Sequence, residues 1–240
     1  MFAIGHFALG YLTGKAIAKP LHIQLNMTLL LTASVIPDVD LLLRFLHHRG
    51  PTHSLITIAI LMTPFLIYYR KAAVPYAVAL ASHSMIGDLI GGTQLLWPLS
   101  RREYGALDVY VSGSFSVALE LILFVTSLAL MLKTRDLQRI TTSNYRIVLL
   151  LPFGATMGPL LAVGRGPEYA LPSLLIIPSL FYIAIFTYTL AVRPSKKSTS
   201  EIKKHETKEL TQAIEEMKKL LNKIPSKEIV KATRDSRDQR

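Results

Sequence analysis

The sequence predicts an all-α, polytopic membrane protein of about seven helices with a polar C-terminal amphipathic helix. Half of its 240 residues are hydrophobic, the mean hydropathy is +0.36, and only 18% of the residues are charged. Soluble domains carry about 25% charged residues, so this composition is typical of a protein that lies in a bilayer. The chain has no cysteine, so any bound metal must take nitrogen and oxygen ligands.

Apolar runs bounded by charges, proline or glycine mark the expected helices. They cover residues 4–18, 22–36, 54–70, 73–91, 115–132, 146–163 and 170–192. The last three are long enough to span a bilayer with some tilt. The first two have about 15 residues each and are short, tilted or re-entrant. Gly10 and Gly14 form a GxxxG step, for which we predict close helix packing.

The polar end of the chain is expected to be separate from the membrane part. We predict a membrane-embedded domain over residues 1–194 and a basic cytoplasmic tail over residues 195–240. Within the tail, residues 201–224 repeat apolar side chains at helical spacing, which predicts an amphipathic helix. This helix either lies on the anionic inner leaflet or pairs with another helix, a second copy included.

Basic residues in the short connections predict the orientation in the cell membrane. With the tail in the cytoplasm, eleven Lys and Arg residues fall on the cytoplasmic side and five on the other. This bias favours an extracytoplasmic N-terminus and a cytoplasmic C-terminus in a multi-pass protein. Successive spans cross the membrane in opposite directions. This orientation therefore puts His6, the 37–53 loop, the outer half of the 73–91 helix and the 92–114 loop on one extracytoplasmic face.

The 37–53 loop begins with the acidic motif PDVD. Pro37 should end the preceding helix at Ile36. If the following residues are extended, Asp38 and Asp40 point the same way. Two nearby carboxylates repel unless a cation or a proton lies between them, although Arg44 alone would satisfy one of them.

The same loop ends with the motif HHRGPTHS, which holds two candidate ligands. His48 and His53 flank a Gly-Pro turn, and Thr52 is the expected N-cap of the helix that starts at Ser54. At a helix N-terminus, the dipole keeps an imidazole neutral and able to bind metal, and the free N–H groups attract an anion.

The fourth predicted helix supplies His83 and Asp88. Five residues apart, they lie about 140° apart around an ideal helix, so they share a face only if the helix loosens at Gly87 or bulges.

These residues are expected to converge on one rim and to bind a divalent metal ion. Histidine and carboxylate without thiolate suit zinc, manganese or iron, and seven ligands exceed the needs of one tetrahedral zinc, so we expect two or more ions. The predicted ligands are His6, Asp38, Asp40, His48, His53, His83 and Asp88. We predict structural or solvated roles for the remaining histidines, His22, His47 and His205.

Residues 1–110 resemble the membrane-bound metal-dependent hydrolases of the YdjM-like family. The resemblance is carried by GH(x3)G, then PDxD, then HRGxTHS, then a helical His and Asp followed by LLWPLS. The matching positions are His6, Gly10, Pro37, Asp38, Asp40, His48, Arg49, Gly50, Thr52, His53, Ser54, His83, Asp88, Trp97 and Pro98. The family usually spaces the helical His and Asp by four residues, whereas this chain has five.

The resemblance implies a hydrolase, and its pattern is distantly similar to that of zinc-dependent phospholipase C. This similarity implies a multi-metal phosphodiesterase centre in which the metals activate water and neutralise phosphate oxygens. Asp40 is our choice for the carboxylate that orients the water. Arg49 either clamps a phosphate or pairs with Asp38 or Asp40. Thr52 and Ser54 are expected to contact the substrate.

Other residues suggest contacts with the membrane. Trp97 and Tyr104, beside Arg101 and Arg102, fit an interfacial belt that contacts headgroups. Glu120 is expected to support the site from the bundle interior.

The expected partners are membrane lipid and a phosphoester such as a phospholipid or lipid-linked phosphate, and no nucleic acid is expected. Two other functions remain open. One is a divalent-metal or proton-coupled transporter, which needs ligands near the bilayer midplane. The other is a scaffold that works through the tail and uses the cluster as a structural metal site.

Overall fold

The computed structural model describes residues 1–41, 48–88, 91–105, 112–161 and 171–192, together with residues 211 and 215. Every regular element in these residues is a helix, apart from one isolated bridge between Thr93 and Tyr104. The predicted all-α class is therefore confirmed. The chain divides into a unit over Met1–Arg193 and a unit over Pro194–Arg240. The second unit lies almost entirely outside the described residues, so the helix over 201–224 stays a prediction.

The first unit contains long helices joined by short ones. The α-helices are α1 (Ala3–Ala18), α2 (Met27–Ala33), α3 (Leu55–Tyr69), α4 (Val74–Ser82), α5 (Ser114–Lys133), α6 (Asp136–Thr141), α7 (Leu150–Leu161) and α8 (Ile176–Ala191). The 3-10 helices are Ile36–Leu41, Pro51–His53, Arg70–Ala73, Arg146–Leu149 and Ser173–Leu175, and a π-helix covers His83–Gly87.

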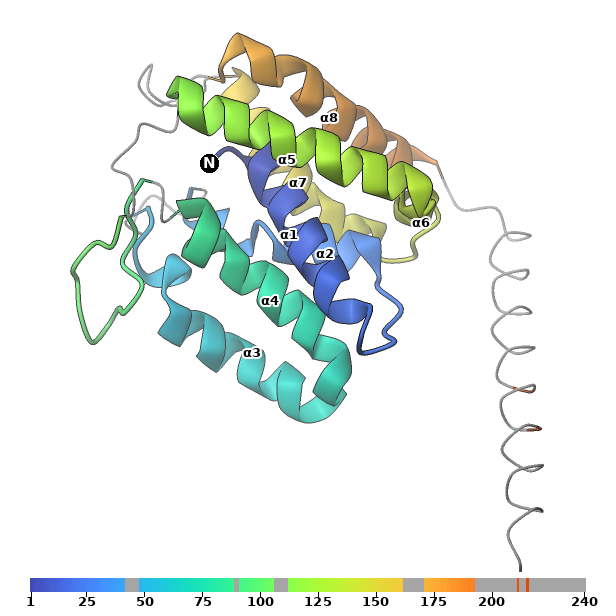
Figure 1. Cartoon of the computed structure of the whole chain (residues 1–240), viewed down its shortest axis with the longest axis horizontal. Helices are drawn as coiled ribbons and strands as arrows, with labels where there is room; N and C mark the ends of the chain where they lie inside the picture. The colour runs from blue at the N-terminus through green and yellow to red at the C-terminus, as the bar shows by residue number, and fades with distance from the viewer. Residues whose placement is uncertain are drawn as a thin grey trace, which may run out of the picture. The chain divides into compact units, whose positions relative to one another are not determined.

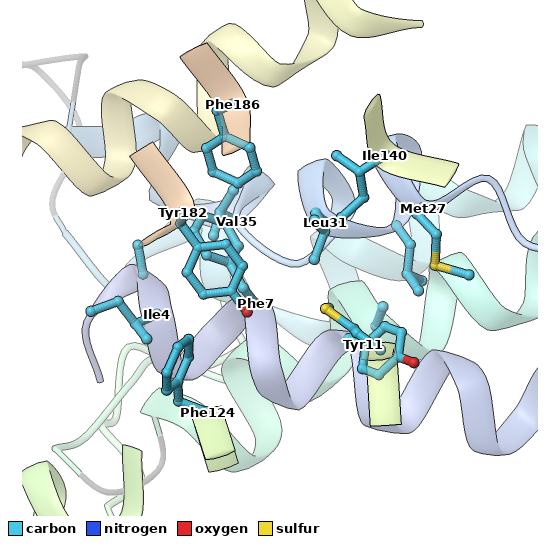
Figure 2. Close-up of a cluster of buried hydrophobic side chains, with 14 of the residues drawn as sticks. Ile4, Phe7, Tyr11, Met27, Leu31, Val35, Phe124, Ile140, Tyr182 and Phe186 are labelled. Carbon is cyan, nitrogen blue, oxygen red and sulfur yellow. The ribbon is translucent and has the colours of Figure 1, made fainter. Parts of the chain in front are cut away.

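Helix α1 is the axis of this unit and packs against α2, α4 and α5 (Figure 1). Phe7, Ala8 and Tyr11 are fully buried. The ring of Phe7 lies 4.9 Å from that of Tyr182 and 5.5 Å from that of Phe186, both from α8, as measured between centroids (Figure 2). A helix that is apolar on all sides is buried among other elements. Helix α1 therefore forms the core of the protein and has little contact with lipid.

Two glycines allow α2 to lie close to α1. A Cβ atom at Gly10 would overlap Cβ of Ser34, and one at Gly14 would lie 2.6 Å from Cδ1 of Leu30. The predicted packing role of Gly10 and Gly14 is confirmed. The close approach also places Ser34 beside α1, just before the acidic motif.

Three helical runs in the described residues are long and apolar enough to cross a membrane: Leu55–Gly87, Ser114–Lys133 and Ser173–Ala191. The first folds back at Arg70, where φ is 50° and ψ is −129°, so that α3 and α4 form a hairpin (Figure 1). Helix α2 has seven residues and rises only about 10 Å, too short for a hydrocarbon core of about 30 Å. The expectation of about seven spanning helices is not confirmed.

The outer surfaces of these runs are apolar. Ile67 on α3 is 73% exposed, Ile122 on α5 is 63% exposed and Ile177 on α8 is 77% exposed. Soluble monomers rarely expose extended apolar surfaces of this kind, whereas lipid solvates them. The structure therefore supports a location in the membrane.

A buried carboxylate anchors the C-terminal end of α1. Asp136, at the start of α6, is fully buried, and its Oδ2 accepts hydrogen bonds from Tyr11 Oη at 2.9 Å and Thr134 Oγ1 at 2.5 Å. Lys15 Nζ donates to the same oxygen. Burial raises the pKa of Asp136, but the hydrogen bonds from these three groups lower it more, so the pKa lies below its ordinary value of 3.8. The ionised carboxylate ties α1 to the connection between α5 and α6.

Asp136→Asn should lower the free energy of unfolding by about 1–3 kcal/mol, because it leaves the half-buried Lys15 ammonium without its counter-charge. The folded-state pKa of Asp136 lies below the unfolded value. The difference between variant and parent should therefore be complete above about pH 4 and be lost as the pH falls through the folded-state pKa. Thermal unfolding in detergent at pH 7 and pH 3 measures this difference in stability between variant and parent. Lys71→Met, which removes an exposed charge, is the control, and equal stability of Asp136→Asn and parent at pH 7 would contradict the prediction.

Candidate metal centre

The acidic motif folds as the 3-10 helix Ile36–Leu41. In a 3-10 helix, residues two apart lie about 240° apart around the axis, so Asp38 and Asp40 point to different sides. The segment is not extended, so the condition under which the two carboxylates would point the same way is not met. Helix α2 also ends earlier than predicted, at Ala33 instead of Ile36.

Four ligand atoms from three separate segments converge. His53 Nε2 and His83 Nε2 are 3.2 Å apart, and Asp88 Oδ2 lies 3.0 Å from the first and 3.1 Å from the second. Asp38 Oδ1 lies 3.6 Å and 3.5 Å from the same two nitrogens. The side chains of His53, His83 and Asp88 are at most 2% exposed. The structure thus brings together four of the seven predicted ligands in a buried cluster.

A π-turn brings His83 and Asp88 to the same face. In the π-helix His83–Gly87, the backbone N–H of Asp88 bonds to the carbonyl of His83. In an ideal α-helix, side chains five residues apart lie about 140° apart around the axis. The wider π-turn, closed by this hydrogen bond, brings the side chains of His83 and Asp88 closer to one face. Gly87 also leaves room for α1, because a Cβ atom there would lie 2.5 Å from Cε1 of His6. The bulge that the sequence allowed is present.

His53 Nε2, His83 Nε2 and Asp88 Oδ2 fit three ligand positions of a tetrahedral divalent cation. Ligands about 2.0–2.1 Å from zinc lie about 3.3 Å from one another, and these three atoms lie 3.0–3.2 Å apart. Asp38 Oδ1 lies 3.5–3.6 Å from the two nitrogens, and its side chain is 11% exposed. Nδ1 of His83 lies 2.7 Å from the carbonyl oxygen of Ser34, so the neutral ring has its proton there and a lone pair on Nε2. That lone pair faces Oδ2 of Asp88, a buried oxygen with no hydrogen-bond partner. A cation between them would remove this repulsion.

Asp40 lies behind His53. Its Oδ2 is 3.3 Å from His53 Nδ1, on the far side of the ring from the cluster. Further donors to its two oxygens are the His48 ring, the Arg49 amide and the Thr52 hydroxyl. Burial raises the pKa of Asp40, but the hydrogen bonds from His48 and His53 outweigh burial and hold the pKa well below its ordinary value of 3.8. Metal-binding histidines commonly have such a carboxylate on their second nitrogen.

Two further histidines extend the cluster. The His6 ring stacks on His83 with 3.6 Å between ring centroids. His6, Asp38 and His83 form one set whose ligand atoms lie within 4.8 Å of one another, and Asp38, His48 and His53 form another. These sets overlap with the buried set of two histidines and Asp88. The three sets share Asp38, His53 and His83, and each of them could hold a metal ion.

The guanidinium of Arg49 lies beside Asp88. Arg49 Nε is 3.6 Å from Asp88 Oδ1, and its Nη1 donates a hydrogen bond of 3.1 Å to the carbonyl of Gly91. The predicted side-chain partners were Asp38 and Asp40, so this pairing is a correction, although the Arg49 amide does bond to Asp40. The backbone at Arg49 is left-handed, with φ at 62°.

The hydroxyls of Thr52 and Ser54 make hydrogen bonds within the protein. Thr52 donates to Asp40 at 2.9 Å, whereas Ser54 caps α3 by accepting from Ile56 N at 3.1 Å. The prediction of Thr52 as the N-cap is therefore wrong. Ser54 also donates to the Trp97 carbonyl at 2.6 Å. Substrate contacts by these two hydroxyls stay predictions.

Glu120 supports α1 from α5. Its two carboxylate oxygens accept hydrogen bonds from Phe2 N at 2.9 Å and Gly5 N at 3.3 Å, which satisfies amides in the first turn of α1. Glu120 is fully buried, so its predicted place in the bundle interior is confirmed. The sequence did not indicate its bonds to the α1 amides, nor the Ser34 carbonyl that orients His83. His22 is exposed, as expected. Three further positions named from the sequence lie outside the described residues: Arg44, His47 and His205.

Comparison with known proteins gives one family. Residues 1–158 match the model of the YdjM inner membrane protein family, a stretch that contains every residue of the cluster. No curated protein and no solved structure matches the chain significantly, so the distant similarity to zinc-dependent phospholipase C has no support. The match covers more than half of the chain, which therefore belongs to the YdjM inner membrane protein family.

Proposed function

We propose that this protein is a membrane-bound, metal-dependent hydrolase of a phosphoester, such as a phospholipid or lipid-linked phosphate. The convergence of His53, His83, Asp88 and Asp38 supports the proposal most directly. Two histidines and a carboxylate are the ligands of several hydrolytic zinc centres, and manganese or iron accept the same donors. The overlapping ligand sets favour two or more ions.

The exposure of the cluster favours an enzyme over a structural metal site. Asp38, His48 and Arg49 are 11%, 25% and 18% exposed, whereas the other ligand side chains are almost fully buried. A structural zinc site is closed by protein ligands, whereas a catalytic site keeps an open position. The ligands also lie at helix ends, whereas transporter sites lie near the midplane. This placement favours a surface reaction.

Each residue has a distinct proposed role. A bound divalent cation supplies Lewis acidity toward a phosphoryl oxygen and acidifies water. Asp38, on the accessible side, orients the attacking water and accepts its proton, the role first assigned to Asp40. Asp40 fixes the ring of His53 by holding its Nδ1. Arg49 presents its positive charge to the phosphate oxygens.

His53→Asn and His83→Asn should each lower the amount of metal that copurifies with the protein, because each removes a nitrogen ligand. Elemental analysis of the detergent-solubilised protein, after dialysis against limiting zinc, measures the ratio of metal to protein. His22→Asn is the matched control and should keep the parent ratio, since His22 is exposed. A His53→Asn protein with the parent metal ratio would remove the basis for the metal centre.

Asp38→Asn and Asp40→Asn should differ in their response to metal. Asp38→Asn should lower kcat for phosphoester hydrolysis by about 100-fold or more at any metal concentration, because it removes the proton acceptor. Asp40→Asn should weaken metal affinity by about 10–100-fold, so excess zinc or manganese should restore its activity. Assays with a panel of phosphoesters, with a chelator as control, test this. Restoration of Asp38→Asn by excess metal, or chelator-insensitive hydrolysis, would exclude these roles.

The charge bias and the geometry together support an extracytoplasmic site. Ser112 and Gln138 are exposed residues beyond the two ends of α5. Single cysteines introduced at Ser112 and Gln138 into this cysteine-free chain should differ in labelling by a membrane-impermeant reagent in intact cells. Ser112→Cys should react, while Gln138→Cys and the tail variant Ser198→Cys should react only after lysis. The reverse pattern would place the centre in the cytoplasm.

A further inference from the structure

The segment of residues 95–99, here called the 95–99 loop, presents apolar side chains beside the metal centre. Leu99 is 84% exposed and Leu96 is 40% exposed. A single exposed leucine needs no explanation, but the exposed pair Arg101 and Arg102 follows this loop after Ser100. In Figure 1 the segment that contains it, in green, projects beyond the ends of α3 and α4.

The position of the 95–99 loop is fixed by hydrogen bonds at the start of α3. Leu55 N donates to the Leu95 carbonyl at 3.0 Å, and Ser54 Oγ donates to the Trp97 carbonyl at 2.6 Å. Ser100 N closes the loop on the Leu96 carbonyl at 2.9 Å. The exposed leucines are therefore held outward by an ordered backbone.

The same loop joins the lipid-facing surface to the metal centre. Leu55 begins α3, whose outer residues Ile60 and Ile67 are 69% and 73% exposed. On the other side, Gln94 N donates to the Arg49 carbonyl at 3.0 Å, and Ser54 directly follows the ligand His53. The loop is thus bonded to the start of α3 at Leu55 and to the edge of the cluster at Arg49.

The order of side chains matches the layers of a bilayer surface. Leucines come first, and the two arginines follow, with the guanidinium of Arg102 5.8 Å from the centre of the Tyr104 ring. Leucine favours the acyl region, whereas tyrosine and arginine favour the headgroup level, where arginine pairs with phosphate. We infer that the 95–99 loop inserts into the leaflet on the side of the metal centre, with Arg101 and Arg102 at the lipid phosphates.

This inference deepens the proposed function and rests on it for one consequence. A centre beside an inserted loop receives its phosphoester from the same leaflet, so the substrate class is a bilayer lipid with a phosphate headgroup. Free, water-soluble phosphoesters would lack the contacts with Leu96 and Leu99.

Insertion can be measured without any activity. Leu99→Cys, labelled with an environment-sensitive fluorophore, is reconstituted into vesicles of phosphatidylcholine and phosphatidylglycerol that carry a nitroxide on the acyl chain. We expect blue-shifted emission and strong nitroxide quenching, as for the control Ile177→Cys on α8, which is 77% exposed. Arg102→Cys should be quenched more by a headgroup nitroxide. Emission as in water, with quenching of the Leu99 label by aqueous iodide alone, would overturn the inference.

A second assay separates this inference from the proposed function. Leu99→Asp should lower the ratio of activity on a vesicle phospholipid to activity on a short-chain soluble phosphoester by about tenfold, through KM, because a charge opposes insertion. Ile177→Asp serves as the matched control and should leave the ratio unchanged. An unchanged ratio for Leu99→Asp would exclude delivery of lipid by the loop. A parent protein that inserts the labelled loop but hydrolyses neither substrate would refute the hydrolase and leave the lipid contact in place.

Discussion

The backbone hydrogen bond from Asp88 N to the His83 carbonyl, which closes the π-turn at the end of α4, determines how the centre is assembled. Without the extra residue in this turn, His83 and Asp88 would point apart, and no single cation would contact both. The turn also ends at Gly87, where the absence of a side chain admits the His6 ring of α1. The π-turn at the end of α4 thus places Asp88 beside His53 and leaves room for His6 of α1.

Around that turn, each of the two central histidines is held by a second group. The Ser34 carbonyl fixes the proton of His83, and Asp40 holds the ring of His53. Asp40 itself accepts several hydrogen bonds, which compensates for the cost of burying its charge. Asp40 therefore ties the helix Ile36–Leu41 to residues 48–53, while the Asp38 side chain stays partly exposed.

Polar groups occupy both ends of α1, and apolar packing fills the length between them. The metal cluster and Glu120 lie at its first turn, and Asp136 with Lys15 lies near its last turn. At the first turn, the Glu120 carboxylate of α5 satisfies the amides of Phe2 and Gly5. Near the last turn, Asp136 of α6 accepts hydrogen bonds from the Tyr11 and Lys15 side chains. This arrangement holds the His/Asp cluster at the N-terminal end of α1, close to the start of α3.

The sequence by itself determined the class and the ligand types. Its apolar content requires a lipid environment, and the absence of cysteine leaves only histidine and carboxylate for a metal. The motifs also named all four atoms of the buried cluster, because residues such as His53 and Asp88 are costly in an apolar chain unless they have a function. These conclusions depend on composition and residue chemistry, which do not change with folding.

Tertiary structure alone decided which carboxylate faces the centre. Asp38 and Asp40 would be equivalent on an extended strand. Instead, the segment is a 3-10 helix that packs against the helix Pro51–His53 and against α7, and this helix separates the two side chains. Likewise, Ser54 rather than Thr52 caps α3 because Asp40 engages the Thr52 hydroxyl, and a break at Arg70 makes one long apolar run into a hairpin. In short segments the backbone period is set by packing partners distant in sequence, so local propensity could not assign these directions.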